Sequence, residues 1–398
     1  MEKRLKAAEL FLSLGLTAAL AVGCTAPKET TSGSTQEAAP VVKASEGGEG
    51  GEGGEGGEGE ISKRLEWGNR FDDESAIADF TNTVVIPNYE QFADKTAALN
   101  QAIDTFASES SQENLEAARQ AWSAARTSWE TTETFAFGPA GSLGFDGAMD
   151  SWPVNQTDIE NILSGAEPIT AERVAGLQDT ERGMHAIEYL LFGTESNKPI
   201  ADFSDREKSF LVALGQDLNQ SADALLASWQ QGADGQPAYK TVFASAGSPN
   251  NMVYPTTTAA AQELVSGIIS SLTEVSEEKL AVPFAEQDTQ GLESRFSAQT
   301  MNDLKSNLQS AENGYLGRLP AENLQAESSI STYIESIDPQ LDQKVKAEFL
   351  AANKALDAIP TPLEVHLNDP AAKSDIEAAI ASISNVKTTI ENEVVPLI

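Results

Sequence analysis

Cysteine is almost absent from this sequence, because Cys24 is the only one among 398 residues. A single cysteine cannot close an intramolecular disulfide, and it cannot build the multi-cysteine sites that hold structural zinc or iron–sulfur clusters. Histidine is nearly as scarce, with only His185 and His366. Any metal site in this chain must therefore use carboxylates beside at most two imidazoles.

Positive charge is also in short supply. The chain has 26 lysines and arginines against 61 acidic residues, which gives a formal net charge of −35. Such a field repels nucleic acids and anionic lipid headgroups, so we expect no nucleic-acid partner. It attracts cations and cationic partners, although solubility alone also explains an acidic surface.

Long hydrophobic runs are missing as well. Residues 1–6 are basic, and the apolar stretch at 11–22 is too short to cross a bilayer comfortably. This stretch ends in Ala21-Val22-Gly23-Cys24, which looks like a bacterial lipobox. We predict a lipoprotein signal peptide at 1–23 and a lipid on Cys24, which would leave the mature chain without a thiol. An ordinary secretory signal is the alternative.

The N-terminal segment predicts how the protein is attached to a membrane. Residues 24–60 are rich in small and polar residues, and 46–60 repeat Gly-Gly-Glu. With almost nothing to bury, this stretch should be a disordered tether. We therefore expect a body attached to a membrane through its lipid only, in the periplasm or on the cell surface of a bacterium.

The remainder of the chain lacks strand patterns and is helical in character. Leu115, Ala118, Trp122, Ala125 and Trp129 recur at helical spacing, and similar apolar stripes occupy 211–229, 264–275 and 376–394. The fold class is therefore predicted to be all-α. A Gly- and Pro-containing break at 193–203 divides the body into halves that each suit a four-helix-bundle-like domain, 61–200 and 201–398.

Two segments read as capping boxes at helix starts. They are Thr157-Asp158-Ile159-Glu160 and Ser204-Asp205-Arg206-Glu207. Pro87 is expected to kink or split an early helix.

His185 and Glu188 form the most informative pair in the chain. Three residues apart, they leave the same face of a helix, where both can bind one metal ion. Four-helix-bundle metal sites use this spacing in the opposite order. The alternative is a His–Glu hydrogen bond within the helix.

Two further acidic residues are candidate ligands. Glu133 follows Trp122 by eleven residues, close to three helical turns, which would place it on the tryptophan stripe. A carboxylate there needs a partner, either a metal ion or a cation such as Arg126. Asp150 lies in a Gly-rich loop before Trp152, where it is either a weaker candidate ligand or a helix cap.

A standard zinc peptidase motif is absent. The zincin pattern His-Glu-x-x-His fails because Ala186 follows His185, and both it and the inverted pattern fail at Tyr189. The distant His366 is expected to be a surface or packing residue. One histidine with several carboxylates suits iron or manganese better than catalytic zinc.

These motifs together resemble the imelysin-like family, whose hallmark Gly-x-His-x-x-Glu is matched by Gly183, His185 and Glu188. Further blocks occur in the same order: Trp122 to Gly138, Asp150 to Pro153, Glu293 to Ser297, and Tyr315 to Gly317. The resemblance implies two helical-bundle domains with the histidine motif in a cleft near their junction. It also implies a link to iron acquisition, in the manner of iron-regulated lipoproteins.

Three functions follow as hypotheses. The first is an anchored protein of iron uptake, not an enzyme, that binds a metal ion or an iron chelate and works with an iron-transport partner. Its ligands would be His185, Glu188, Glu133 and Asp150, and the resemblance adds Arg126, Glu293, Arg295 and Ser297 as residues that close the cleft. The second is a metallopeptidase that uses the same residues, with Glu188 and His185 as the catalytic pair. The third is a helical module that binds a partner protein without metal.

Overall fold

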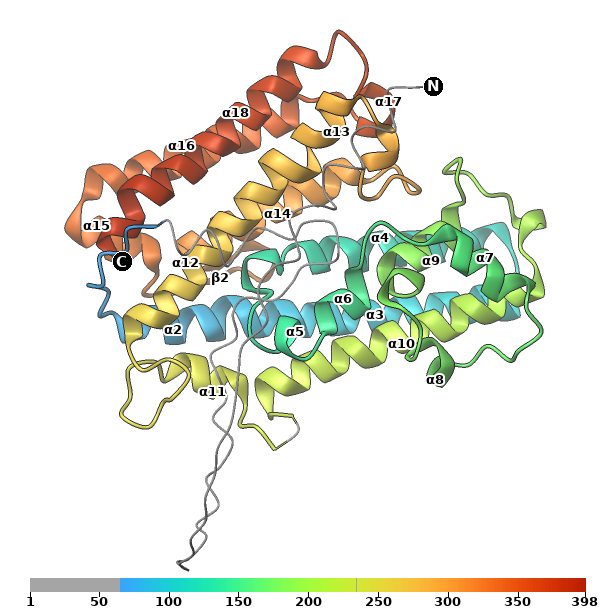
Figure 1. Ribbon diagram of the computed structural model, residues 1–398, viewed down its shortest axis with the longest axis horizontal. Coiled ribbons are helices and arrows are strands. Elements are labelled where there is room, and N and C mark those ends of the chain that lie inside the picture. Colours follow the sequence, from blue (N-terminus) through green and yellow to red (C-terminus); the bar gives the residue numbers. More distant parts are fainter. Residues whose placement is uncertain (1–64, 234) are drawn as a thin grey trace, which may run out of the picture. The chain divides into compact units, whose positions relative to one another are not determined.

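Helices supply nearly all regular structure in this computed structural model, which describes residues 65–233 and 235–398 (Figure 1). The only strands in these residues are the two-residue pair β1 (Arg318–Leu319) and β2 (Leu324–Gln325), which is antiparallel. The predicted all-α class is confirmed. The predicted signal peptide, the lipidated Cys24 and the tether at 24–60 lie outside the described residues.

The first half of the described chain carries the longer helices α3, α4 and α10 and several short ones. Their bounds are α2 (Glu74–Phe80), α3 (Ile86–Ser108), α4 (Gln112–Glu130), α5 (Pro139–Ser142), α6 (Phe145–Asp150), α7 (Gln156–Ser164), α8 (Ala171–Val174), α9 (Gly183–Phe192) and α10 (Asp205–Gln230). A π-helical turn η1 (Thr81–Val85) joins α2 to α3, and η2 (Glu133–Phe135) follows α4 as a 3₁₀ turn.

The second half continues with helices of the same kind. They are α11 (Tyr239–Ala244), α12 (Thr257–Thr273), η5 (Glu274–Lys279), α13 (Ala281–Glu286), α14 (Thr300–Leu316), α15 (Ile330–Ile337), α16 (Pro339–Ala358), α17 (Leu363–His366) and α18 (Lys373–Thr389). Shorter 3₁₀ and π turns complete it: η3 (Asp179–Glu181), η4 (Ile200–Asp202), η6 (Thr289–Gly291), η7 (Pro320–Glu322), η8 (Ile390–Val394) and η9 (Val395–Leu397).

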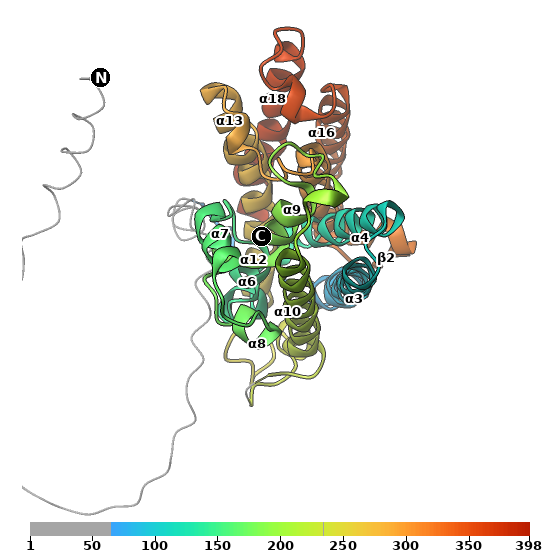
Figure 2. The same cartoon turned by 90° about the vertical axis from the view of Figure 1, so that its right-hand side faces the viewer.

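Neighbouring helices pack in a continuous series. Helix α10 packs on α3, α3 on α4, α4 on α14, α14 on α12, α12 on α18, and α18 on α16. Figure 1 places α16 and α18 on one side of α12 and α14, and α3 and α10 on the other, and in Figure 2 α16 and α18 again lie away from α3 and α10. All described residues belong to one compact unit. The division into domains 61–200 and 201–398 stays a prediction, and α10, which begins after that boundary, packs on the earlier helices α3 and α9.

Helix α4 shows how the sequence builds the core. Ser111 caps its start, because the Ser111 hydroxyl accepts a hydrogen bond from the Asn114 amide at 3.1 Å. The stripe from Leu115 to Trp129 is buried along its whole length, as the spacing predicts. Full burial of each large apolar side chain contributes about 1.5–3 kcal/mol to folding. The Trp122 indole also donates to the carbonyl of Met184 at 2.9 Å, which fastens α4 to α9.

Other expectations about local structure had mixed outcomes. The capping box of Ser204 and Glu207 is confirmed at the start of α10. The one at Thr157 is wrong, because Asn155 caps α7 instead, accepting from the Asp158 amide at 3.2 Å. Pro87 does not split its helix, because the helical run is unbroken from Glu74 to Ser108. The run changes from α to π geometry at η1, directly before Pro87, where a proline is expected to disturb it.

None of the helices in the described part of the chain is both long and apolar enough to span a membrane.

Candidate metal centre

Helix α9 carries the histidine motif, and Gly183 determines how closely its start approaches α6. Gly183 has a φ of +76°, and a Cβ atom there would lie 2.4 Å from the carbonyl oxygen of Met149. Only glycine tolerates both the backbone conformation and this contact. The close approach brings His185 beside Asp150, which immediately follows Met149 at the end of α6.

The predicted pairing of His185 and Glu188 on one face of α9 is present. Both residues are fully buried, and Nδ1 of His185 lies 3.1 Å from Oε2 of Glu188. The other oxygen of Glu188, Oε1, accepts hydrogen bonds from the backbone N–H and the hydroxyl of Ser297, each at 2.8 Å. Both oxygens of Glu188 therefore have partners, and the imidazole is held with Nε2 facing away from Glu188.

Asp150 lies on the Nε2 side of the ring. Its Oδ1 is 3.3 Å from Nε2 of His185 and also forms an ion pair with Arg126. Its Oδ2 accepts a hydrogen bond from the Trp129 indole at 2.7 Å. Asp150 is thus held from α4 on one side and faces His185 on the other.

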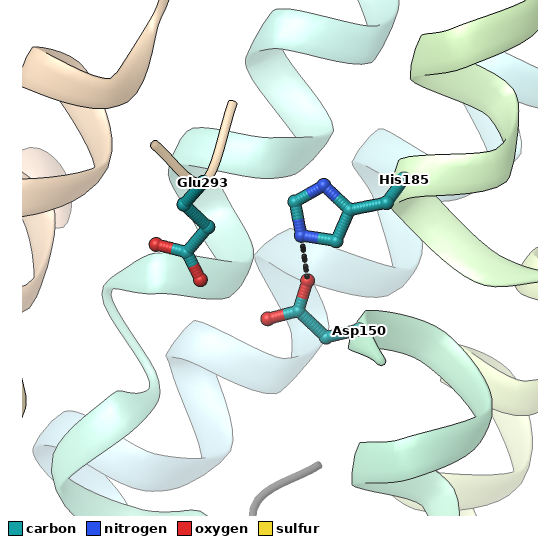
Figure 3. Close-up of side chains that lie close together, drawn as sticks. All are labelled: Asp150, His185 and Glu293. Carbon is teal, nitrogen blue, oxygen red and sulfur yellow. Dashed lines mark ion pairs between the residues drawn. The ribbon is translucent and has the colours of Figure 1, made fainter. Parts of the chain in front are cut away.

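Glu293 completes a group of three possible ligands. Single ligand atoms of Asp150, His185 and Glu293 all lie within 4.8 Å of one another. Figure 3 shows the imidazole and the two carboxyl groups pointing toward one another from three separate segments. Among the described residues, Oε2 of Glu293 has no hydrogen-bond partner, and the contact of Nε2 of His185 is the one with Asp150 at 3.3 Å.

A larger set of buried charges surrounds this group. We call it the charge cluster, and its members are Arg126, Glu130, Asp150, His185, Glu188, Lys279, Glu293 and Asp303. Arg126 contacts four carboxyl groups in it: Asp150, Glu130 at 2.6 Å, Glu293 at 3.0 Å and Asp303 at 3.6 Å. The cluster holds five carboxyl groups but only two permanently charged cations, so it carries an excess of acid.

The electrostatics of the cluster follow from this crowding. Burial and the charge of Arg126 lower the pKa of His185, but Asp150 and Glu188 outweigh them and raise it to about 9. Burial raises the pKa of Asp150, yet Arg126 and His185 bring it well below its usual range. For Asp303, burial prevails over Arg126, and the pKa is raised well above that of a free aspartate. Several buried acids so close together cannot all ionise without added positive charge.

Glu133 does not lie on the tryptophan stripe, which corrects the expectation from spacing. Helix α4 ends at Glu130 because the hydroxyls of Thr131 and Thr132 each donate to a carbonyl three residues back, both at 2.7 Å. Glu133 begins the separate turn η2 and is not in the group with His185. Burial, and next the charge of Glu274, raise its pKa well above normal.

Of the remaining candidate residues, some contact the charge cluster and others do not. Arg126 and Ser297 lie in the cluster or bind it, as described. Arg295 packs its guanidinium over the Phe296 ring, 4.2 Å from the centroid, and contacts Gln290 instead of the ligand group. His366 is about one-third exposed in α17, with Nδ1 3.6 Å from Asp369.

A polar cavity of about 490 Å³ lies on another face of α4, against α3 and α14. Residues such as Gln91, Ser123, Gln299 and Asn313 line it, and none of the predicted site residues does. His185 and Glu188 are therefore buried, and neither of them lines this cavity.

Sequence reasoning did not select four members or neighbours of the cluster as site residues: Glu130, Lys279, Asp303 and Asn307. Asp303 and Asn307 do carry a signal, because they form a polar line with Ser310 at helical spacing along α14, next to its apolar stripe. Lys279 carries none, since its partners Glu130, Glu293 and Asn307 come from other elements and bear no regular spacing to it.

The sequence matches a known protein family and a curated relative. The family model of Imelysin, Peptidase_M75, matches residues 85–390. A relative from Synechococcus elongatus, Iron-regulated protein A, is 40% identical over 322 residues, which cover 81% of this chain and 86% of the relative.

Solved structures share the fold. A crystal structure from Parabacteroides distasonis, described as an iron-regulated protein A precursor, has a TM-score of 0.70 at 24% identity and covers 84% of this chain and 98% of its own. An imelysin-like protein from Psychrobacter arcticum has a TM-score of 0.64 at 15% identity, with 80% and 92% covered.

Proposed function

This chain belongs to the imelysin family, and from that membership and the geometry of its charge cluster we propose that it binds a single metal ion, iron, as cargo. The observation that carries the proposal is the group of Asp150, His185 and Glu293, whose ligand atoms lie within 4.8 Å of one another. A cation there would give a partner to Oε2 of Glu293, a buried oxygen that has none among the described residues.

The donor set fits iron. One imidazole nitrogen with two carboxylate oxygens is a combination that suits iron or manganese. Glu188 would act from outside the ligand group, because a carboxylate on the second ring nitrogen fixes the tautomer and orientation of a ligating histidine. In this proposal Glu188 is a positioning residue, and Glu133 is not a ligand.

The cellular role follows from the relatives and the N-terminus. A relative with 40% identity is named Iron-regulated protein A, and the sequence before Cys24 resembles a lipobox. We propose a lipid-anchored protein outside the cytoplasm that holds iron for uptake and passes it to a transport partner. An acidic surface would raise the local concentration of cations near such a site.

The geometry gives less support to a peptidase. A hydrolytic metal centre needs an open ligand position for water and a free general base. Here His185 and Glu188 are fully buried, and both oxygens of Glu188 already accept hydrogen bonds from Ser297 or contact His185. A peptide bond could reach these groups only after the surrounding helices separate.

Calorimetric titration with ferrous iron under anaerobic conditions tests the proposal. We expect about one equivalent to bind to the wild-type protein and none to bind tightly to His185→Ala. His366→Ala is the matched control, since it removes the only other histidine and should leave binding unchanged. Equal iron binding by wild type and His185→Ala would overturn the proposal.

A further inference from the structure

Lys279 places a positive charge inside the charge cluster, beside the proposed metal position. It ends η5 and its side chain is only 14% exposed. Its Nζ lies 3.1 Å from Oε1 of Glu293, 3.2 Å from Oδ1 of Asn307, and 3.7 Å from one oxygen of both Glu130 and Glu274. Three carboxylates and an amide oxygen around one cation are a donor set that metal ions such as Mg²⁺, Ca²⁺ and Mn²⁺ also accept.

Glu293 connects this ammonium to the group around His185. Its Oε1 is shared by Lys279 and Arg126, whereas Oε2 has no hydrogen-bond partner among the described residues. The same residue belongs to the group with Asp150 and His185. One carboxyl group thus faces two cation positions. A carboxylate shared in this way is also how helical bundles build sites for two metal ions.

Asn307 fixes the orientation of the ammonium cage. Its Nδ2 donates to Oε2 of Glu130 at 2.6 Å, which leaves Oδ1 turned toward Lys279. Both residues are fully buried, and they come from α14 and α4. The oxygens of Glu130 and Asn307 around Lys279 are therefore set by the packing of helices, while Glu274 contributes from a partly exposed position.

We propose that the Lys279 ammonium takes the place of a second metal ion, which restricts the native centre to one ion. Without the ammonium, Glu130, Glu274, Glu293 and Asn307 form an all-oxygen cation site that shares Glu293 with the first. This inference rests on the proposed function, because the first ion is the one at His185. A tethered ammonium excludes a second ion by occupying its space and by repelling its charge.

Manganese(II) is a suitable probe, because it is stable in air and its paramagnetic resonance spectrum reports a second ion nearby. The full chain is titrated as wild type, Lys279→Ala and Lys279→Arg, with stoichiometry from calorimetry. We expect one ion in wild type and in Lys279→Arg. Lys279→Ala should bind two, with a spectrum broadened by spin coupling. If Lys279→Ala does not fold, Lys279→Ser replaces it, with the same expectation of two ions.

The outcomes separate this inference from the proposed function. One His185-dependent ion in wild type together with one in Lys279→Ala overturns the inference and leaves the proposed function intact. Two ions in wild type also overturn it. If no manganese binds to wild type or to Lys279→Ala, the inference is wrong, and the proposed function is decided separately by the ferrous titration of wild type and His185→Ala.

Discussion

At the scale of single residues, the centre depends on the side chains that hold His185. Glu188 contacts Nδ1 of the ring and is itself held by Ser297, so the imidazole has one orientation available. Residues that position metal ligands typically affect metal affinity by about 10–100-fold.

We therefore predict that Glu188→Gln weakens iron binding by about 10–100-fold without unfolding the protein. The amide keeps the size of the side chain but removes the negative charge that supports the ring. The matched control is Glu160→Gln in α7, outside the cluster, because the Glu160 carboxylate accepts a hydrogen bond from the Tyr189 hydroxyl of α9 at 2.7 Å. Calorimetric titration measures both, and unchanged affinity in Glu188→Gln would argue against a positioning role.

A second prediction at this scale concerns pH and the ion pair of Glu207 with Lys198. Burial raises the pKa of Glu207, but hydrogen bonds from Lys198 and Ser204 outweigh it and lower the pKa below the unfolded value of about 4.3. The pair therefore stabilises the fold above that value, and its contribution is lost as the pH falls through the lower, folded value.

Urea unfolding of Glu207→Gln should accordingly show reduced stability at pH 7, with the difference from wild type shrinking as the pH falls below about 4.3. Exposed Glu172 provides the control, since Glu172→Gln should differ little from wild type at either pH. A difference for Glu207→Gln that grows on acidification would contradict the assignment.

At the scale of elements, the approach of α9 to α6 creates the contact between His185 and Asp150. We predict that Gly183→Ala destabilises the protein by at least about 1–3 kcal/mol, because alanine must adopt a positive φ. The collision with the Met149 carbonyl should also separate the two ligands and weaken iron binding. In Gly176→Ala, the added carbon meets only an ordinary contact at 3.5 Å, so this variant serves as the control. Urea unfolding measures the stability and calorimetry the iron affinity. If Gly183→Ala matches wild type in both, the close approach of α9 to α6 does not position His185 beside Asp150.

Several features of the helices could be predicted from the sequence alone. Local patterns predicted the apolar stripe of α4, the cap at Ser204 and the pairing of His185 with Glu188, because each depends on residues within a few turns. Glu133 was misplaced because the two threonine hydroxyls end α4 early, a competition that spacing does not reveal.

The residue types predicted Asp150 as a candidate ligand, but the contacts across elements themselves could not be derived from one sequence. Asp150 and Glu293 reach His185 from α6 and from the segment before α14, and Lys279 reaches them from η5. Family resemblance suggested Glu293 as a cleft residue, but nothing local distinguished Lys279 from the other exposed-looking lysines.

At the scale of the whole molecule, a bound ion would tie together α6, α9 and the segment that carries Glu293. An ion that binds only the folded state stabilises it by about 2.7 kcal/mol at a free concentration of ~100 times Kd. We predict that iron raises the melting temperature of wild type and not of His185→Ala, as measured by calorimetric scanning. A chelator should reverse the shift, and an equal shift in both proteins would point to binding elsewhere.

Attachment to the membrane is a further property of the whole molecule. We predict that Cys24→Ala moves the protein from the membrane fraction to the soluble fraction, since the lipid would be its only anchor. Iron binding by the released protein should equal that of wild type. Cell fractionation measures the first effect, and persistent membrane association of Cys24→Ala would contradict the lipoprotein assignment.

Anomalous scattering from a crystal soaked in ferrous iron tests the central claim most directly. We predict one strong iron peak in bonding contact with Nε2 of His185 and the carboxyl groups of Asp150 and Glu293. Lys279 should remain in contact with Oε1 of Glu293. Iron found only at surface carboxylates, with the buried group unchanged, would contradict it.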